Sequence, residues 1–223
     1  MMRMLKILGS ALITLGMCAS VNAQDKPKTL DELRAQGYSV KSITPIYSQL
    51  LLTGYPQGFQ TAYEKVNGPS YIRELVPIGE TVDNWTKMMT ISGIKGLASK
   101  ADITPKIVLS NMAGGFKRAC PNSFSAQVVT EGKLSGFDSF VAVVSCGVSP
   151  ATGGKSSETA LIAVIKGQSD YYTIQWAERS APSNEPIALD VPTWAGKLSL
   201  MSPIKLCPIV PGEQAPYPSC VGP

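Results

Sequence analysis

Two segments, residues 137–146 and 160–165, are apolar on both faces of an extended chain, and they constrain the fold more than any other feature of the sequence. The alternating side chains of the first segment form two apolar sets: Phe137, Val141 and Val143, and Phe140, Ala142 and Val144. A strand that is apolar on both faces belongs in the interior of a covered sheet. We therefore expect both segments to be interior strands.

Shorter strands are predicted on either side of these two. Alternation and turn residues indicate extended segments at 39–47, 49–53, 59–66, 71–76, 86–91, 124–131 and 171–178. Asn67-Gly68 is a hairpin turn signal between two of them. Residues 93–100 are expected to be a linker.

The strongest helix signal begins at Thr104, a capping residue followed by proline at the first helical position. The next three turns place four apolar residues on one face: Leu109, Met112, Ala113 and Phe116. Gly114-Gly115 weakens the last turn. We expect that the helix ends at these glycines or that another backbone packs closely against them.

Together these elements predict an α+β fold in which one antiparallel sheet carries helices on one or both faces, like an α/β/α sandwich. A single domain is expected to span residues 24–206. Prolines after residue 181 permit only short helical pieces, as at 193–200. Residues 207–223 are expected to form a proline-rich tail, an ordered loop that a disulfide fastens to the body.

Residues 1–23 have the features of a signal peptide. Arg3 and Lys6 precede an apolar run, and small residues lead to a cleavage site after Ala23. The predicted mature chain begins at Gln24 with a short helix at 30–36, and it contains no second apolar run long enough to span a bilayer. We therefore expect a periplasmic or secreted protein with no transmembrane segment.

Four cysteines remain in the mature chain, and an even number in an exported protein predicts two disulfides. Three pairings are possible, and we expect Cys120–Cys146 and Cys207–Cys220. Cys146 lies on the same face of its strand as Phe140. A helix packed on that face would bring Cys120, just beyond the helix end, within reach.

The sequence contains no histidine, which excludes Ser-His-Asp and Cys-His catalysis and every His-ligated metal site. The cysteine spacing is too wide for a zinc site, so we predict no metal and no cofactor. The formal charge is +4 for the whole chain and +2 without Arg3 and Lys6. The remaining cations are scattered, and we expect no nucleic-acid partner.

The candidate contact site is the turn 80–86. It begins the segment 80–91, which is the densest mixture of carboxylate, aromatic and hydroxyl groups in the chain. Glu80, Asp83, Trp85 and Thr86 are the residues we expect to touch a ligand or partner. The competing interpretation, which the sequence favours, is structural: Glu80 or Asp83 caps the turn and Trp85 is core. Two carboxylates among Glu74, Glu80 and Asp83 would be the minimum for glycoside hydrolysis.

Other motifs are weaker. Residues 147–156 are similar to a phosphate-binding loop, but Ser149 stands where the first glycine is required, and we expect a hairpin loop instead. Lys155 with Ser156 or Ser157 would supply the groups of a serine–lysine hydrolase, but a glycine-rich loop does not order them. A ligand groove lined by the tryptophans at 85, 176 and 194 is a further alternative to core packing.

The run Gly79-Glu-Thr-Val-Asp-Asn-Trp-Thr-Lys-Met-Met-Thr90 resembles a segment of small exported proteobacterial proteins of unknown function. It is also similar to the PsbP-like α/β/α sandwich group, in which an acid-x-x-x-x-Trp-Thr turn leads into a sheet strand. The similarity covers about a dozen residues and is supported by the strand order over residues 47–178. The resemblance implies a fold but says almost nothing about activity, and residues 181–223 lie outside it.

We therefore predict an exported binding or accessory protein that does not catalyse a reaction. Its partner would be an envelope protein or a small ligand. The alternative is a carboxylate-dependent hydrolase acting on a cell-envelope polymer.

Overall fold

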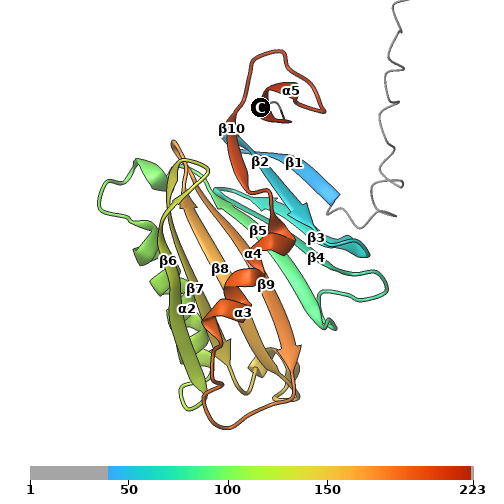
Figure 1. Cartoon of the computed structure of the whole chain (residues 1–223), viewed down its shortest axis with the longest axis vertical. Helices are drawn as coiled ribbons and strands as arrows, with labels where there is room; N and C mark the ends of the chain where they lie inside the picture. Colours follow the sequence, from blue (N-terminus) through green and yellow to red (C-terminus); the bar gives the residue numbers. More distant parts are fainter. Residues whose placement is uncertain (1–39, 222–223) are drawn as a thin grey trace, which may run out of the picture.

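The computed structural model describes residues 40–221 (Figure 1). The predicted signal peptide, its cleavage site and the helix at 30–36 lie outside the described residues. The described part has an α+β fold, as predicted, and it contains two antiparallel sheets rather than one.

The larger sheet has seven strands in the order β3-β4-β5-β9-β8-β7-β6, and every neighbouring pair is antiparallel. The strands are β3 (Phe59–Asn67), β4 (Ser70–Pro77), β5 (Lys87–Ile94), β6 (Phe124–Leu134), β7 (Phe137–Cys146), β8 (Ser157–Lys166) and β9 (Tyr171–Ser180). The two strands expected in the interior, β7 and β8, are interior strands and are buried almost throughout. The predicted linker at 93–100 was wrong in part: β5 continues to Ile94, and a short 3-10 helix, η1 (Leu97–Ser99), lies within the expected linker.

The smaller sheet has the order β1-β2-β10, with β1 (Val40–Ile46), β2 (Gln49–Tyr55) and β10 (Lys205–Pro208). The prediction of a loop from residue 207 onward was therefore wrong for residues 207–208, which belong to β10, and the boundary at 206/207 falls inside a strand. The reason is that the side chains of β10 alternate between two cores. Leu206 packs toward the large sheet, whereas Cys207 packs with Leu50 and Leu52 on the far side.

The two faces of the large sheet are covered by different elements (Figure 1). On one face α2 (Pro105–Ala119) packs over β6, β7 and β8. On the other face lie the small sheet and two short helices, α3 (Val191–Gly196) and α4 (Leu198–Met201). The predicted arrangement with helices on both faces is thus observed, with the small sheet sharing one layer.

The helix α2 starts as predicted, because the Thr104 hydroxyl accepts a hydrogen bond from the Ile107 backbone N–H at 3.2 Å. Both expectations for Gly114-Gly115 were wrong. The helix continues to Ala119, and the atom nearest to a Cβ at Gly114 would belong to Arg118 of the same helix. Packing of the apolar face against the sheet outweighs the low helix propensity of the two glycines.

Both predicted disulfides are present. Cys120–Cys146 joins the end of α2 to the end of β7 with a Cα–Cα distance of 5.6 Å. Cys207–Cys220 joins β10 to α5 (Pro218–Val221) with a Cα–Cα distance of 5.5 Å. Among the helices of residues 40–221, none is long and apolar enough to cross a membrane.

A buried carboxylate connects the two sheets. Asp170, in the turn between β8 and β9, is only 2% exposed. Its Oδ2 accepts hydrogen bonds from the backbone N–H of Ser48 at 3.0 Å and from the Tyr172 hydroxyl at 3.4 Å, and its Oδ1 accepts from the Gly96 N–H at 2.7 Å. The Ser48 hydroxyl also donates to Oδ2. The turn between β1 and β2 is thereby fixed to the large sheet.

Candidate functional site

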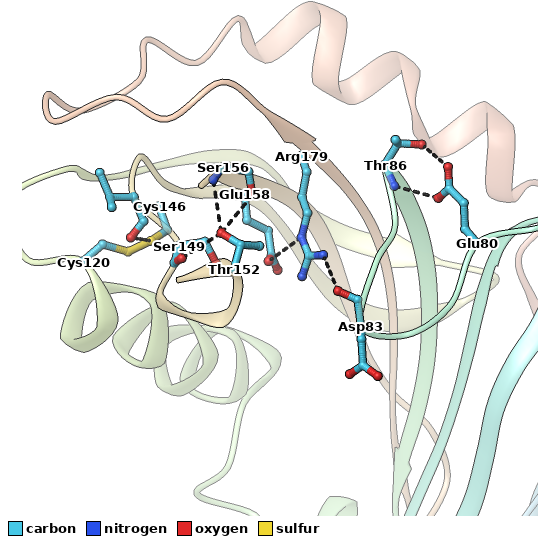
Figure 2. A network of polar contacts seen from close by, with 11 residues as sticks. Glu80, Asp83, Thr86, Cys120, Cys146, Ser149, Thr152, Ser156, Glu158 and Arg179 are labelled. Carbon is cyan, nitrogen blue, oxygen red and sulfur yellow. Dashed lines mark hydrogen bonds and ion pairs between the residues drawn. A yellow bond between two sulfur atoms is a disulfide. The ribbon is translucent and has the colours of Figure 1, made fainter. Parts of the chain in front are cut away.

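The turn before β5 is closed by Glu80 and Thr86 (Figure 2). Glu80 Oε2 accepts a hydrogen bond from the Thr86 N–H at 2.7 Å, and Oε1 accepts from the Thr86 hydroxyl at 2.8 Å. Asn84 N–H donates to Thr81 Oγ1 inside the same turn. Glu80 therefore has the capping function that the competing interpretation predicted, and both of its oxygens are used.

Trp85 is core, with 6% of its surface exposed, and it belongs to the apolar cluster beneath α2. The Arg179 guanidinium lies over its ring, with Cζ 3.8 Å from the ring centroid. Arg179 Nη1 also donates to the backbone oxygen of Asp83 at 3.3 Å. The Asp83 side chain is exposed, and in Figure 2 its carboxylate points away from Arg179. The four predicted residues thus form two groups, one closing the turn and one surrounding Arg179.

Neither Glu158 nor Arg179 was predicted as a site residue from the sequence. They are cross-strand partners in β8 and β9, with Arg179 Nε 3.8 Å from Glu158 Oε2. The Arg179 side chain is 11% exposed and the Glu158 side chain is 21% exposed. A signal existed in the sequence: Gly167-Gln-Ser-Asp170 separates the strands expected at 160–165 and 171–178, and counting outward from this turn places residue 158 opposite residue 179.

Burial raises the pKa of Glu158 above its ordinary value, and the charge of Glu74 adds to this, while the Arg179 guanidinium opposes it. The carboxyl group is therefore desolvated and incompletely compensated by its partner. Such a group favours a ligand that brings further hydrogen-bond donors or a positive charge.

The loop at 147–156 faces the turn. Ser149 N–H donates to the Ser156 backbone oxygen at 2.8 Å, and the Thr152 hydroxyl donates to the Ser149 oxygen and accepts from the Ser156 N–H. The loop contains a short 3-10 helix, η2 (Pro150–Thr152), and β8 begins at Ser157. No helix follows Lys155, so the loop lacks the strand–loop–helix geometry of a phosphate-binding loop, as predicted.

Between the turn and the loop lies a pocket of about 410 Å³. Its lining comes from both segments and from β9: Asp83, Asn84, Trp85, Ala151, Thr152, Lys155, Ser156 and Arg179. A smaller, more apolar hollow of about 230 Å³ lies on the other side of Ala151 and is lined in part by Glu158, Phe116 and Cys146. The pocket combines two cations, two side-chain hydroxyls and an aromatic ring. These groups can bind and orient a polar ligand.

The tryptophan groove is excluded by the fold. Trp85 belongs to the cluster beneath α2, whereas Trp176 and Trp194 belong to the cluster on the opposite face of the sheet. The indole N–H of Trp176 donates to Glu178 Oε1 at 2.8 Å, and Lys197 donates to the same oxygen. Within residues 40–221, no three His, Cys, Asp or Glu side chains gather in a group that could hold a metal ion.

No protein-family model matches the chain, and no curated protein matches it. Among solved structures, it is similar to a protein from Bacteroides thetaiotaomicron, with 14% identity and a TM-score of 0.41 over 79% of this chain; the match spans half the length of that protein. It is also similar to the Ran-binding protein Mog1p from Saccharomyces cerevisiae, with 13% identity and a TM-score of 0.39, covering 72% of this chain and 83% of that one. A mutant of Mog1 gives 12% identity and the same TM-score, covering 71% and 84% of the two chains. Matches this remote carry no argument about function.

Proposed function

We propose that this chain is an exported, periplasmic or secreted binding protein that does not catalyse a reaction, and that its ligand or partner occupies the pocket between residues 83–85 and 151–156. The observation that carries the proposal is this pocket, because two loops distant in sequence converge there on a fixed guanidinium. The two disulfides support export, since disulfides persist in oxidising compartments.

The chemistry of the pocket supports binding over catalysis. Arg179 is held in place by Trp85, Glu158 and a backbone oxygen, so it presents a fixed donor rather than a mobile one. Lys155 is exposed at the rim and adds a second donor. Ser156 is the nearest hydroxyl to it in sequence, and within the described residues neither Ser156 nor Ser157 is hydrogen-bonded to Lys155. The ligand would therefore supply acceptor oxygens, as a peptide segment of an envelope protein or a small ligand does.

The test uses the mature chain with both disulfides intact as bait for envelope extract and for soluble peptidoglycan fragments. Lys155→Glu reverses a charge at the pocket rim, and Lys100→Glu is a matched control, because Lys100 is exposed and lies outside the pocket. We expect the wild-type and Lys100→Glu proteins to retain the same partner and Lys155→Glu to lose it. Equal retention by Lys155→Glu would refute the site.

A second candidate function is a carboxylate-dependent hydrolase acting on a cell-envelope polymer. Glu158 favours it, because this carboxyl group lines a hollow and has a raised pKa. Glu80 is less suited, because both of its oxygens accept hydrogen bonds from Thr86. Turnover of peptidoglycan or glycans that is lost in Glu158→Gln and kept in Glu80→Gln would establish the hydrolase and overturn the binding proposal.

The relationship to the exported proteobacterial proteins, and to the PsbP-like group, is part of the same proposal. Residues 79–90, which carry the resemblance, form the capped turn and the first half of β5.

A further inference from the structure

α2 covers only one half of the helix-bearing face of the large sheet. In the other half Val76 and Met88 are buried beside Trp85, whereas the row of residues next to them is part-exposed. α2 packs over β6, β7 and β8, and the same face of β9, β5, β4 and β3 lies beyond it. Residues that pair across neighbouring strands form one row on this open half: Tyr63 in β3, Glu74 in β4, Thr90 in β5 and Gln175 in β9. The next residue in the row, Ile162 of β8, belongs to the cluster under α2, which fixes the face on which the row lies.

Glu74 is the charged member of this row, and it has no partner among the described residues. It is half-buried, and burial is the sole cause that raises the pKa of its carboxyl group. Lys65 is on the same face of β3, opposite Ile72, but no ion pair joins it to Glu74. A desolvated carboxylate without a cation or donor is unfavourable, and a ligand that supplies one would gain from the contact.

An apolar hollow of about 420 Å³ lies beside the row. Ser92 and Thr173 line it from the sheet and are hydrogen-bonded to each other. The other walls come from the segment 94–103 and from α2: Ile94, Leu97, Ile103, Ile107, Val108, Asn111 and Met112. Its volume falls in the range of small-molecule sites, about 300–1,000 Å³.

The hollow and the row are a fixed distance apart. Ser92 lies two residues from Thr90 along β5, and Thr173 lies two residues from Gln175 along β9. Two residues of a strand span about 7 Å. A molecule with its apolar part in the hollow therefore reaches the row that contains Glu74 if its polar group lies about 7 Å from Ser92 and Thr173.

We propose that this open half-face binds a small amphipathic amine, with its apolar body in the hollow and its ammonium group against Glu74. Charge complementarity selects the amine, because the unpaired group at the row is a carboxylate. Thr90 and Gln175 supply neutral oxygen acceptors beside it, so an ammonium with three donors finds three acceptors. This site is separate from the pocket at Arg179 and does not depend on the function proposed for it.

The experiment titrates the mature, disulfide-intact chain with octylammonium, octanoate and octanol below their aggregation concentrations, followed by calorimetry and by amide NMR. We expect saturable binding of octylammonium, with shifts in β5, β9 and residues 103–112. Octanoate and octanol should bind at least tenfold more weakly. Equal affinity for octanoate would overturn the proposal, because the head group would then not be recognised.

Two variants and two controls locate the site. Glu74→Gln should weaken octylammonium binding about tenfold, since a charged hydrogen-bond acceptor is replaced by a neutral one. Glu131→Gln, at an exposed position of β6, should bind as wild type. Ile107→Lys should abolish binding by placing a cation at the hollow, while Lys155→Glu should leave it unchanged. Unchanged affinity in Glu74→Gln, or displacement of octylammonium by a peptide of residues 24–39, would overturn the proposal.

Discussion

Replacing Asp170 by Asn tests the connection between the two sheets. The native carboxylate accepts four hydrogen bonds, from the Ser48 N–H and hydroxyl, the Gly96 N–H and the Tyr172 hydroxyl. Asn retains one acceptor oxygen and presents an NH₂ group where the other stood, so at least one backbone N–H is left facing a donor. Hydrogen bonds to a charged group contribute about 1.5–3 kcal/mol each. We expect Asp170→Asn to lower the free energy of unfolding by about 3 kcal/mol and Tm by about 10 °C.

The pH dependence gives an independent check. Burial acts to raise the pKa of Asp170, but the hydrogen bonds from Ser48, Gly96 and Tyr172 outweigh it and hold the pKa below its ordinary value. Because the folded pKa is depressed, the stabilisation is fully present above the unfolded pKa of about 3.9 and is lost as pH falls through the folded pKa. The difference between wild type and Asp170→Asn should therefore be constant from pH 7 to pH 5 and shrink below about pH 4.

Urea unfolding followed by tryptophan fluorescence measures both effects. Asp138→Asn is the matched control, because this carboxylate is exposed and pairs with Lys133 at the surface; its unfolding midpoint should not change. Hydrogen exchange at the Ser48 and Gly96 amides should accelerate in Asp170→Asn. A loss below about 1 kcal/mol at pH 7, or a difference that persists unchanged at low pH, would refute the assignment of Asp170 as a charged anchor.

Three further changes have defined outcomes. Removing the Cys207–Cys220 disulfide by double alanine substitution should lower the free energy of unfolding by about 3 kcal/mol, the chain-entropy value for cysteines 13 residues apart in sequence, as measured by urea unfolding. Gly147→Ala should destabilise the protein by about 1–3 kcal/mol, because a Cβ there would collide with the backbone that follows β9. Gly132→Ala should be tolerated, because a Cβ at that position would have no atom within 4 Å. Thermal unfolding of the two variants tests the difference. Trp85→Ala should lower the free energy of unfolding by about 3–5 kcal/mol and reduce the near-ultraviolet circular dichroism, because the variant lacks the buried ring and its stacking contact with Arg179.

Each of these expectations has a contrary result. Full stability of the double alanine variant would mean that β10 stays paired without its disulfide. Equal stability of the two glycine variants would contradict the close approach at residue 147. A Trp85→Ala protein of native stability would place this ring at a contact surface rather than in the core.

Much of the large sheet follows from local patterns. β7 is apolar on both faces and is an interior strand, and the register of β8 with β9 follows from the turn at 167–170. The Cys120–Cys146 disulfide follows from the helix packing on the Phe140 face, because the end of α2 then lies next to the end of β7. In these cases a short segment contains the information that places it.

The small sheet had no such local signal. β10 is four residues long and pairs with β2, about 150 residues earlier in the chain. Within β10 only Leu206 and Cys207 are buried, and two alternating positions are too few to predict a strand in a proline-rich sequence. The open half-face at Glu74 could not be predicted from the sequence either, because it depends on how many strands α2 covers and not on any property of β4 itself.

The pairing of β10 with β2 has a consequence for how the protein is made. One side of β2 is completed only by β10, about 150 residues later in the sequence, so the small sheet can assemble only after residues 205–208 have emerged from the ribosome. Until then Leu50 and Leu52 lack their cover, and β2 has an unpaired apolar edge of the kind that promotes aggregation. A product terminated before Lys205 would keep that edge unpaired, and it should aggregate more readily than a chain that includes β10.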